Sequence, residues 1–169
     1  VDSHGTASAG TAAAKTDNKI GIAGVGFSSS ILGARTGVSN LFALYQNGAR
    51  VVNASWYSSC NDDGSYNITG YDQLAINEMH ENGVVIVVSA GNGYFTGYGP
   101  PTTPCAHPNK FFFPASYNHV ISVTSVGAQD IGYIYPPNGE QRGWRDHLVS
   151  PANTTNTHQI NSAVDIAAP

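Results

Sequence analysis

The run of five valine and isoleucine residues at positions 84–88 constrains the fold more than any other feature of the sequence. A continuous β-branched run of this length is typical of a strand covered on both faces in a parallel sheet. Apolar residues at helical spacing precede it at 71–81, and a second valine-rich segment lies at 51–54. Strand, helix and strand in this order predict right-handed crossovers, a parallel sheet and an α/β fold.

Apolar spacing and turn residues predict the remaining elements. A helix is expected at 38–47, closed by Asn47-Gly48, and a helix of small residues at 3–14 can approach a sheet closely. The helix at 71–81 is expected to turn four residues inward: Leu74, Ala75, Ile76 and Met79. Short strands are expected at 31–35, 120–126 and 164–166, and loops or irregular chain at 15–20, 60–70, 93–109 and 132–162.

The composition excludes several classes of partner. The 169 residues suffice for one domain with a sizeable core, and 41% hydrophobic with 11% charged residues indicates a compact chain rather than disorder. A net charge of −4 without a cluster of Lys and Arg argues against nucleic-acid binding. No apolar segment of the sequence is long enough to span a membrane. Cys60 and Cys105 can pair or stay free, and the small number of lysines favours an extracellular or cell-envelope location.

His4 is a candidate general base. It lies at the start of the small-residue helix, in Ser3-His4-Gly5-Thr6. A neutral imidazole titrates near neutrality, so it can take a proton from a serine hydroxyl and return it to a leaving amine. A histidine that caps a helix or packs in a core would suit the same local sequence, so the segment alone leaves both interpretations open.

Asn92 is a candidate donor to a developing oxyanion. It lies in Ala90-Gly91-Asn92-Gly93, directly after the buried strand expected at 84–88. The carboxyl ends of parallel strands are where functional groups gather. An amide N–H aimed at the transition-state oxygen of an acyl transfer is worth on the order of 3 kcal/mol. An ordinary Asn-Gly turn is the alternative interpretation.

Three segments in this order resemble the subtilisin-like serine proteases, the subtilase family: His4-Gly5-Thr6, Ala90-Gly91-Asn92 and Asp165-Ile166-Ala167-Ala168-Pro169. The resemblance implies a three-layer α/β/α fold with a mostly parallel central sheet, incomplete at both ends. Residues 1–169 would be a single partial peptidase domain, from the catalytic histidine segment to just before the nucleophile serine segment. The implied function is a serine endopeptidase with a Ser-His-Asp mechanism. Because its aspartate and nucleophilic serine would lie outside these residues, the isolated segment is expected to be inactive.

The resemblance also implies roles for particular residues. His4 would be the general base and acid, and Asn92 the oxyanion donor. An extended peptide substrate would bind along five residues: Ser55, Trp56, Tyr57, Ala90 and Gly91. Tyr57 stands where the family usually has glycine, which leaves the preferred side chain at the cleavage site open. Core packing is the alternative interpretation of Trp56 and Tyr57.

Two further expectations come from the same resemblance. The peptide bond between Phe113 and Pro114 is expected to be cis, as in family members. No cofactor is expected for catalysis itself, and calcium, where bound, would be structural. The calcium loop of subtilases corresponds to 17–20, but no metal ligand is assigned. A weaker cation position corresponds to the surroundings of Ala115, Tyr117, Val120 and Asp165.

Two other functional classes share some of these features. A catalytically inactive, subtilase-like module that binds peptides or other proteins would keep the same segments. An unrelated α/β binding domain is suggested by the glycines at 21–26, but their spacing does not match a dinucleotide loop. The partners expected for the protease interpretation are a peptide or protein substrate and the remaining segments of the same domain.

Overall fold

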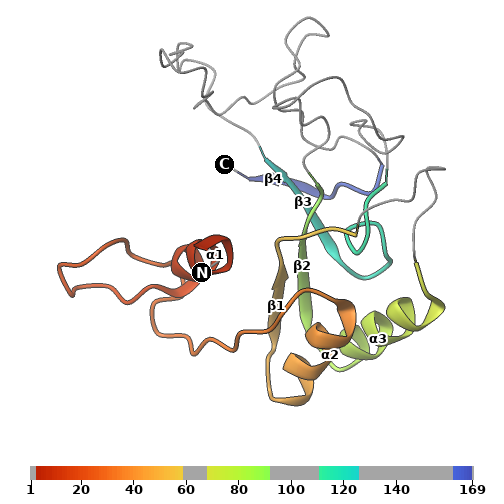
Figure 1. Ribbon diagram of the computed structural model, residues 1–169, viewed down its shortest axis with the longest axis horizontal. Coiled ribbons are helices and arrows are strands. Elements are labelled where there is room, and N and C mark those ends of the chain that lie inside the picture. Colours follow the sequence, from red (N-terminus) through yellow and green to blue (C-terminus); the bar gives the residue numbers. More distant parts are fainter. Residues whose placement is uncertain (1–2, 59–67, 92–110, 126–161, 169) are drawn as a thin grey trace, which may run out of the picture.

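The computed structural model describes residues 3–58, 68–91, 111–125 and 162–168. Their strands form one parallel sheet in the order β1-β2-β3-β4 (Figure 1). The strands are β1 (Val51–Ala54), β2 (Val85–Ser89), β3 (Ile121–Ser125) and β4 (Ile166–Ala168). Each new strand is added on the same side of the previous one. The predicted α/β fold with a parallel sheet is therefore confirmed.

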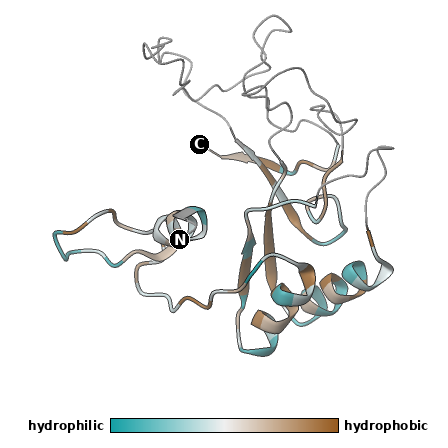
Figure 2. Cartoon of the chain, viewed as in Figure 1, coloured by the Kyte–Doolittle hydropathy of each residue, from teal (hydrophilic) through white to brown (hydrophobic). Residues whose placement is uncertain are grey.

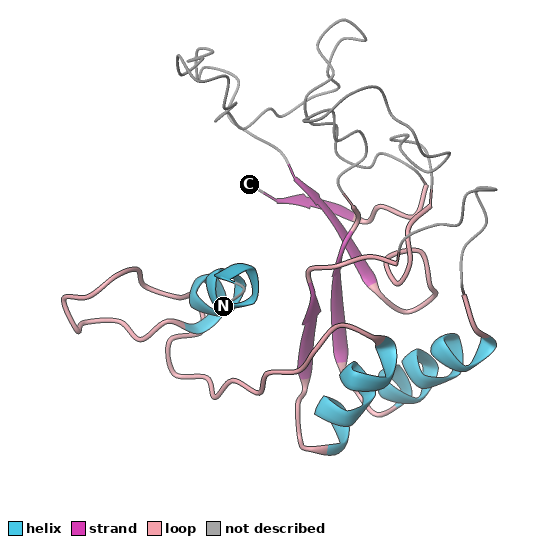
Figure 3. Cartoon of the chain, viewed as in Figure 1, coloured by secondary structure: helices cyan, strands magenta, loops and turns pink. Residues whose placement is uncertain are grey.

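Two helices cover one face of this sheet. They are α2 (Val38–Gln46) and α3 (Gly70–Glu81), which lie side by side (Figure 3). Val52 pairs with Ile86 and Ala54 with Val88 in the parallel register, so these four side chains share that face. All four are at most 2% exposed. The rest of the buried core cluster consists of Val38, Leu41, Ile76, Met79, Val84 and Ala115.

Local sequence determines both ends of α3. The Thr69 hydroxyl oxygen accepts a hydrogen bond from the Asp72 backbone N–H at 3.3 Å, which caps the first turn. At the other end Asn82 is followed by Gly83, whose φ of 76° is the left-handed conformation that glycine adopts without strain. The predicted helix at 71–81 is thus confirmed within one residue.

The inward face of α3 differs from the prediction at one position. Ile76 and Met79 are fully buried and Ala75 is half-buried, as expected. Leu74 is 62% exposed. It lies about 200° around the helix from Ile76, so it points away from the sheet when Ile76 faces it.

The second face of the sheet carries an apolar row that the described residues leave exposed. Val51, Val85, Ile121 and Ile166 share this face and are 65%, 44%, 37% and 52% exposed. Figure 2 shows apolar residues along the strands that form it. The prediction that 84–88 is covered on both faces is therefore wrong for the described residues. Burial along β2 alternates because both packed helices lie on one side.

The first helix, α1 (Ser3–Ala13), packs against no other helix or strand within the described ranges. It is held by the loop that follows it, which folds back along the helix. The Gly24 N–H donates to the Ala14 carbonyl at 2.9 Å, and the Gly26 N–H donates to the Ala12 carbonyl at 2.7 Å. A Cβ atom on Gly24 would lie 2.7 Å from the Ala13 backbone, so only glycine allows this approach. The predicted small-residue helix is confirmed, but its close contact with a sheet is not.

Other sequence-based expectations have mixed outcomes. The helix at 38–47 is confirmed as α2, and the strand at 120–126 as β3. The last strand begins at Ile166, two residues later than expected. The strand predicted at 31–35 is wrong, because that segment has no strand partner among the described residues. The loop expected at 93–109 and most of those at 60–70 and 132–162 lie outside the described residues.

Candidate active site

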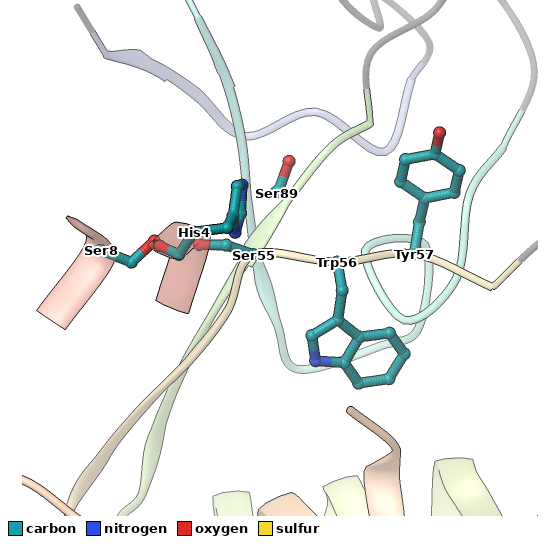
Figure 4. A pocket seen from close by; sticks show the side chains of 6 residues that line it. All are labelled: His4, Ser8, Ser55, Trp56, Tyr57 and Ser89. Atoms are coloured by element: carbon teal, nitrogen blue, oxygen red, sulfur yellow. Dashed lines mark hydrogen bonds between the residues drawn. The ribbon is translucent and has the colours of Figure 1, made fainter. Parts of the chain in front are cut away.

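A pocket of about 390 Å³ opens at the carboxyl ends of β1 and β2 (Figure 4). β1 ends at Ala54, and the chain directly beyond it lines the pocket; β2 contributes its own last residue, Ser89. This is the edge of a parallel sheet at which ligand sites form. The lining residues are His4, Ser8, Ser55, Trp56, Tyr57 and Ser89.

His4 enters the pocket from the first turn of α1. Its side chain is exposed and lies beside Ser55 and Ser89 (Figure 4). Ser8 is one helical turn further along, on the same helix face. The Ser8 hydroxyl donates to the His4 carbonyl at 3.2 Å. The helix therefore presents an imidazole and a hydroxyl to the same space.

Ser55 and Ser89 face His4 from two neighbouring strands. Ala54 and Val88 are register partners, so the residues that follow them lie next to each other. The Asn53 side-chain amide donates to the Ser55 hydroxyl oxygen at 2.8 Å. This hydrogen bond holds the Ser55 side chain in one orientation beside the pocket.

Ser8 and Ser89 were not predicted to line a site. The sequence nevertheless held a pattern that could have indicated each of them. Ser8 follows His4 by four residues on a helix, and Ser89 ends the β-branched run. The register between β1 and β2, which brings Ser89 beside Ser55, is what a single sequence does not show.

Trp56 and Tyr57 point to opposite sides of the extended chain. The Trp56 indole is directed toward the helices and packs against the buried core (Figure 4). The Tyr57 ring stands on the other side and is 42% exposed. It makes an edge-to-face contact with Phe112, with ring centroids 4.8 Å apart, and Phe112 is 4% exposed. Core packing therefore describes the Trp56 ring, although both residues line the pocket.

The segment around Phe113 and Pro114, which lies beside Tyr57 and Ser58, is held by a hydrogen bond and an aromatic contact. The Ser58 N–H donates to the Phe113 carbonyl at 2.8 Å, and the Phe113–Pro114 peptide bond is cis, which confirms the expectation. The Phe113 and Tyr117 rings meet edge to face at 4.8 Å. The pKa of Tyr117 is raised to about 12, first by burial and then by the negative charge and hydrogen bond of Asp72.

Ala90 and Gly91 follow Ser89 but are not among the lining residues. Ala90 is 2% exposed, and its N–H donates to the Val123 carbonyl at 2.8 Å. Gly91 is buried with a φ of 105°, and its N–H donates to the Ser89 hydroxyl oxygen at 3.4 Å. Asn92 lies outside the described residues. The structure thus gathers His4, Ser55 and the two aromatic residues around one pocket, with the Ala90-Gly91 backbone behind it.

Metal ligands do not cluster in the part of the chain that the structure describes. There, no group of three or more His, Cys, Asp or Glu residues could hold an ion. In the loop at 17–20 the Asn18 side-chain oxygen accepts from the Ile20 N–H at 3.0 Å. One Asp165 carboxylate oxygen accepts from the Ser122 N–H at 2.7 Å. Cys60 and Cys105 lie outside the described residues.

A family comparison decides what kind of chain carries this pocket. The model of the subtilase family matches residues 1–169. The chain belongs to the subtilase family. The resemblance seen in its sequence motifs is thereby confirmed.

Two known proteins are similar to this chain in sequence. The thermophilic serine proteinase of Bacillus sp. (strain AK1) is 33% identical over 141 residues, or 77% of this chain and 30% of that protein. Thermitase of Thermoactinomyces vulgaris is 34% identical over 139 residues, or 75% of this chain and 42% of thermitase. This subtilase chain therefore spans about a third of the length of the relatives it matches.

Solved structures agree on the fold. A protease from Pseudoalteromonas arctica PAMC 21717 superposes with a TM-score of 0.56 at 25% identity, covering 95% of this chain and 42% of that one. The psychrophilic subtilisin-like protease Apa1 from Pseudoalteromonas sp. AS-11 gives a TM-score of 0.55 at 23% identity, and the match covers 98% of this chain and 31% of Apa1. The subtilisin-like α/β fold is confirmed. No helix among the described residues is long and apolar enough to cross a membrane.

Proposed function

We propose that this subtilase chain supplies the general base and part of the peptide-binding surface of a serine endopeptidase. The observation that carries the proposal is the pocket in which His4 meets the carboxyl ends of β1 and β2. His4 takes the proton of the nucleophilic serine as its oxygen attacks the scissile carbonyl carbon. His4 then gives this proton to the leaving amine. In the second step His4 takes a proton from water, which attacks the acyl carbon, and returns that proton to the serine oxygen. The serine and the aspartate that orients His4 come from outside residues 1–169.

The other site residues act on the substrate in this proposal. Asn92 donates its amide N–H to the oxyanion of the tetrahedral intermediate. The extended chain at 55–57 and the backbone of Ala90 and Gly91 hold a peptide as an added strand. Both segments end strands of one sheet, which favours this arrangement.

The exposed apolar row supports the participation of further segments. Val51, Val85, Ile121 and Ile166 leave one face of the sheet open to solvent in the described part of the chain. Burying such a row stabilises a fold by about 25 cal/mol per Å² of apolar surface. The remaining segments of the same protease domain are the proposed cover. The relatives, which are more than twice as long as the matched region, leave ample length for it.

We further propose where the enzyme acts and that its catalysis needs no cofactor. The low charge and the small number of lysines suit an extracellular or cell-envelope enzyme that acts on peptides or proteins. Catalysis needs no cofactor, and calcium would serve only stability. Chelation is therefore expected to leave activity in place at temperatures where the protein stays folded.

Fluorophosphonate labelling of the longest natural form, followed by peptide mapping, tests this function. We expect one labelled serine beyond Pro169, and no labelling in a His4→Ala variant. His80→Ala is the matched control, because His80 lies on α3 and does not line the pocket. Its ring stacks on that of His119, with ring centroids 4.2 Å apart. A folded natural form that takes up no probe would contradict the proposal and favour an inactive peptide-binding module.

A further inference from the structure

We propose that Gln73 is a positioning residue, which holds the wall of the pocket beside His4 in place through the turn at 112–119. Gln73 lies on α3 and does not itself line the pocket. It reaches the pocket wall through a series of hydrogen bonds. Its effect on catalysis rests on the function proposed above, whereas its effect on the wall is independent of that function.

The side-chain amide of Gln73 binds the backbone of Asn118 through two hydrogen bonds. The Asn118 N–H donates to Gln73 Oε1 at 2.9 Å, and Gln73 Nε2 donates to the Asn118 carbonyl at 3.2 Å. Nε2 also donates to Asn77 Oδ1 at 2.8 Å, one helical turn further along α3. Because both ends of the amide are engaged at once, the half-buried Gln73 side chain has one orientation against the turn.

The end of the turn that Gln73 holds has a strained backbone. His119 has a φ of 66°, a left-handed conformation that costs free energy for a residue with a Cβ atom. Two contacts with α3 hold this end. Gln73 binds Asn118, and the His119 ring stacks on that of His80 with ring centroids 4.2 Å apart. Without the Gln73 amide, this end of the turn is expected to relax and move.

The turn is also tied together internally. The Ser116 N–H donates to the Phe112 carbonyl at 2.8 Å. The Tyr117 N–H donates to the Pro114 carbonyl at 3.1 Å. The Phe113 and Tyr117 rings meet edge to face with centroids 4.8 Å apart. These contacts make the turn move as a unit, so a displacement at its far end reaches Phe113.

Phe113 connects the turn to the pocket. The chain at 55–58 follows β1 and lies beyond the ladder of hydrogen bonds that joins β1 to β2. Its last residue, Ser58, donates its N–H to the Phe113 carbonyl at 2.8 Å. Three residues of this segment line the pocket together with His4 (Figure 4). The position of the wall relative to His4 therefore depends on the turn, and the position of the turn depends on Gln73.

Amide hydrogen exchange of the natural-length protein tests this path without a need for activity. In Gln73→Ala we expect exchange to accelerate by about fivefold or more in peptides that cover 117–119 and 56–58. Peptides from α2 and β2 should exchange as in the wild type. Gln46→Ala makes the same change at the exposed end of α2 and is the matched control. It should leave 117–119 and 56–58 unchanged.

The rate of fluorophosphonate labelling is the second readout. It is measured at a temperature where circular dichroism shows every variant to be folded, so that a slower rate reports position rather than unfolding. Gln73→Ala should label about fivefold more slowly than the wild type, because the wall is displaced relative to His4. Gln73→Glu keeps the acceptor for the Asn118 N–H and should recover part of the rate. Gln46→Ala should label at the wild-type rate.

Three results would overturn the proposal. Faster exchange at 117–119 alone would show that the turn does not pass the change on to the wall. Equally faster exchange throughout α2 and β2 would make Gln73 a contributor to general stability only. Faster exchange at 56–58 with an unchanged labelling rate would contradict a role in catalysis.

The proposal and the protease function can fail separately. A wild type that takes up no probe contradicts the protease function, while the exchange comparison still decides whether Gln73 holds the wall. Should Gln73→Ala not fold, Asn77→Ala removes only the partner that orients the Gln73 amide. It is expected to give the same pattern of exchange with a smaller amplitude, and wild-type exchange at 117–119 and 56–58 would contradict the proposal.

Discussion

Ser122 and Asp165 are joined by two hydrogen bonds across 43 residues of chain. The Ser122 N–H donates to a carboxylate oxygen of Asp165 at 2.7 Å, and the Asp165 N–H donates to the Ser122 carbonyl at 3.0 Å. Ser122 is 1% exposed, so its N–H has no access to bulk water. The carboxylate therefore fixes the start of β4 against β3 and satisfies a buried donor at the same time.

Asp165→Ala is expected to destabilise the fold by about 2 kcal/mol, because it leaves the buried Ser122 N–H without an acceptor. Asp165→Asn keeps a side-chain oxygen and should lose less. The free energy of unfolding from urea denaturation of the natural-length protein measures both effects. Glu78→Ala, at an exposed position of α3, is the control. Equal losses for Asp165→Ala and Glu78→Ala would show that the carboxylate contributes nothing.

Tyr117 is expected to make stability depend on pH in the alkaline range. Its pKa is raised from an ordinary value of 10.0 to about 12, chiefly by burial and then by Asp72. The folded state therefore binds the phenol proton more tightly than the unfolded state. This contribution is fully present below pH 10 and is lost as the pH rises toward 12. Because the ring is partly exposed, solvent screening limits the effect to about 1 kcal/mol.

The comparison that isolates this effect is wild type against Tyr117→Phe. Melting temperatures of both proteins are measured from pH 8 to pH 12. The wild type should lose more stability than the variant between pH 10 and pH 12, and the two should run in parallel below pH 10. Parallel curves over the whole range would rule out a titrating Tyr117.

Gly24 is expected to control the position of α1. In Gly24→Ala the new methyl group would lie against the backbone of Ala13 and Ala14, where nothing can move aside cheaply. We expect a loss of about 2 kcal/mol from this overpacking. Because the loop holds the helix that carries His4, fluorophosphonate labelling should slow as well. Gly33→Ala is the matched control, since a Cβ there meets nothing within 4 Å.

The sequence predicted well what is encoded in short stretches. The β-branched run at β2 and the apolar spacing of α2 and α3 gave the elements of the α/β unit, because each pattern is complete within a dozen residues. What failed depended on distant partners. Residues 31–35 have a strand-like composition but no partner strand among the described residues. Val85 looked buried because composition does not reveal whether a second layer covers its face.

The site was predictable to a similar extent. Family motifs pointed to His4 and to the segment around Ser55 and Tyr57, which the fold brings to one pocket. Ser89 was missed because its place beside Ser55 follows from the β1–β2 register, which no single-sequence pattern encodes. The opposite directions of Trp56 and Tyr57 follow from strand alternation. Which of the two rings packs against the core could be told only once the side covered by the helices was known.

Asn53 is expected to act through Ser55. Its amide donates to the Ser55 hydroxyl oxygen at 2.8 Å, which holds the Ser55 side chain in one orientation beside the pocket. Asn53→Ala removes one neutral hydrogen bond worth about 1 kcal/mol, so kcat/KM should fall by roughly fivefold. Asn53→Asp replaces the donor with an acceptor that competes for the Ser55 proton, and should cost more. In a Ser55→Ala background the Asn53→Ala change should have no further effect. A full additional fivefold loss there would mean that Asn53 acts independently of Ser55.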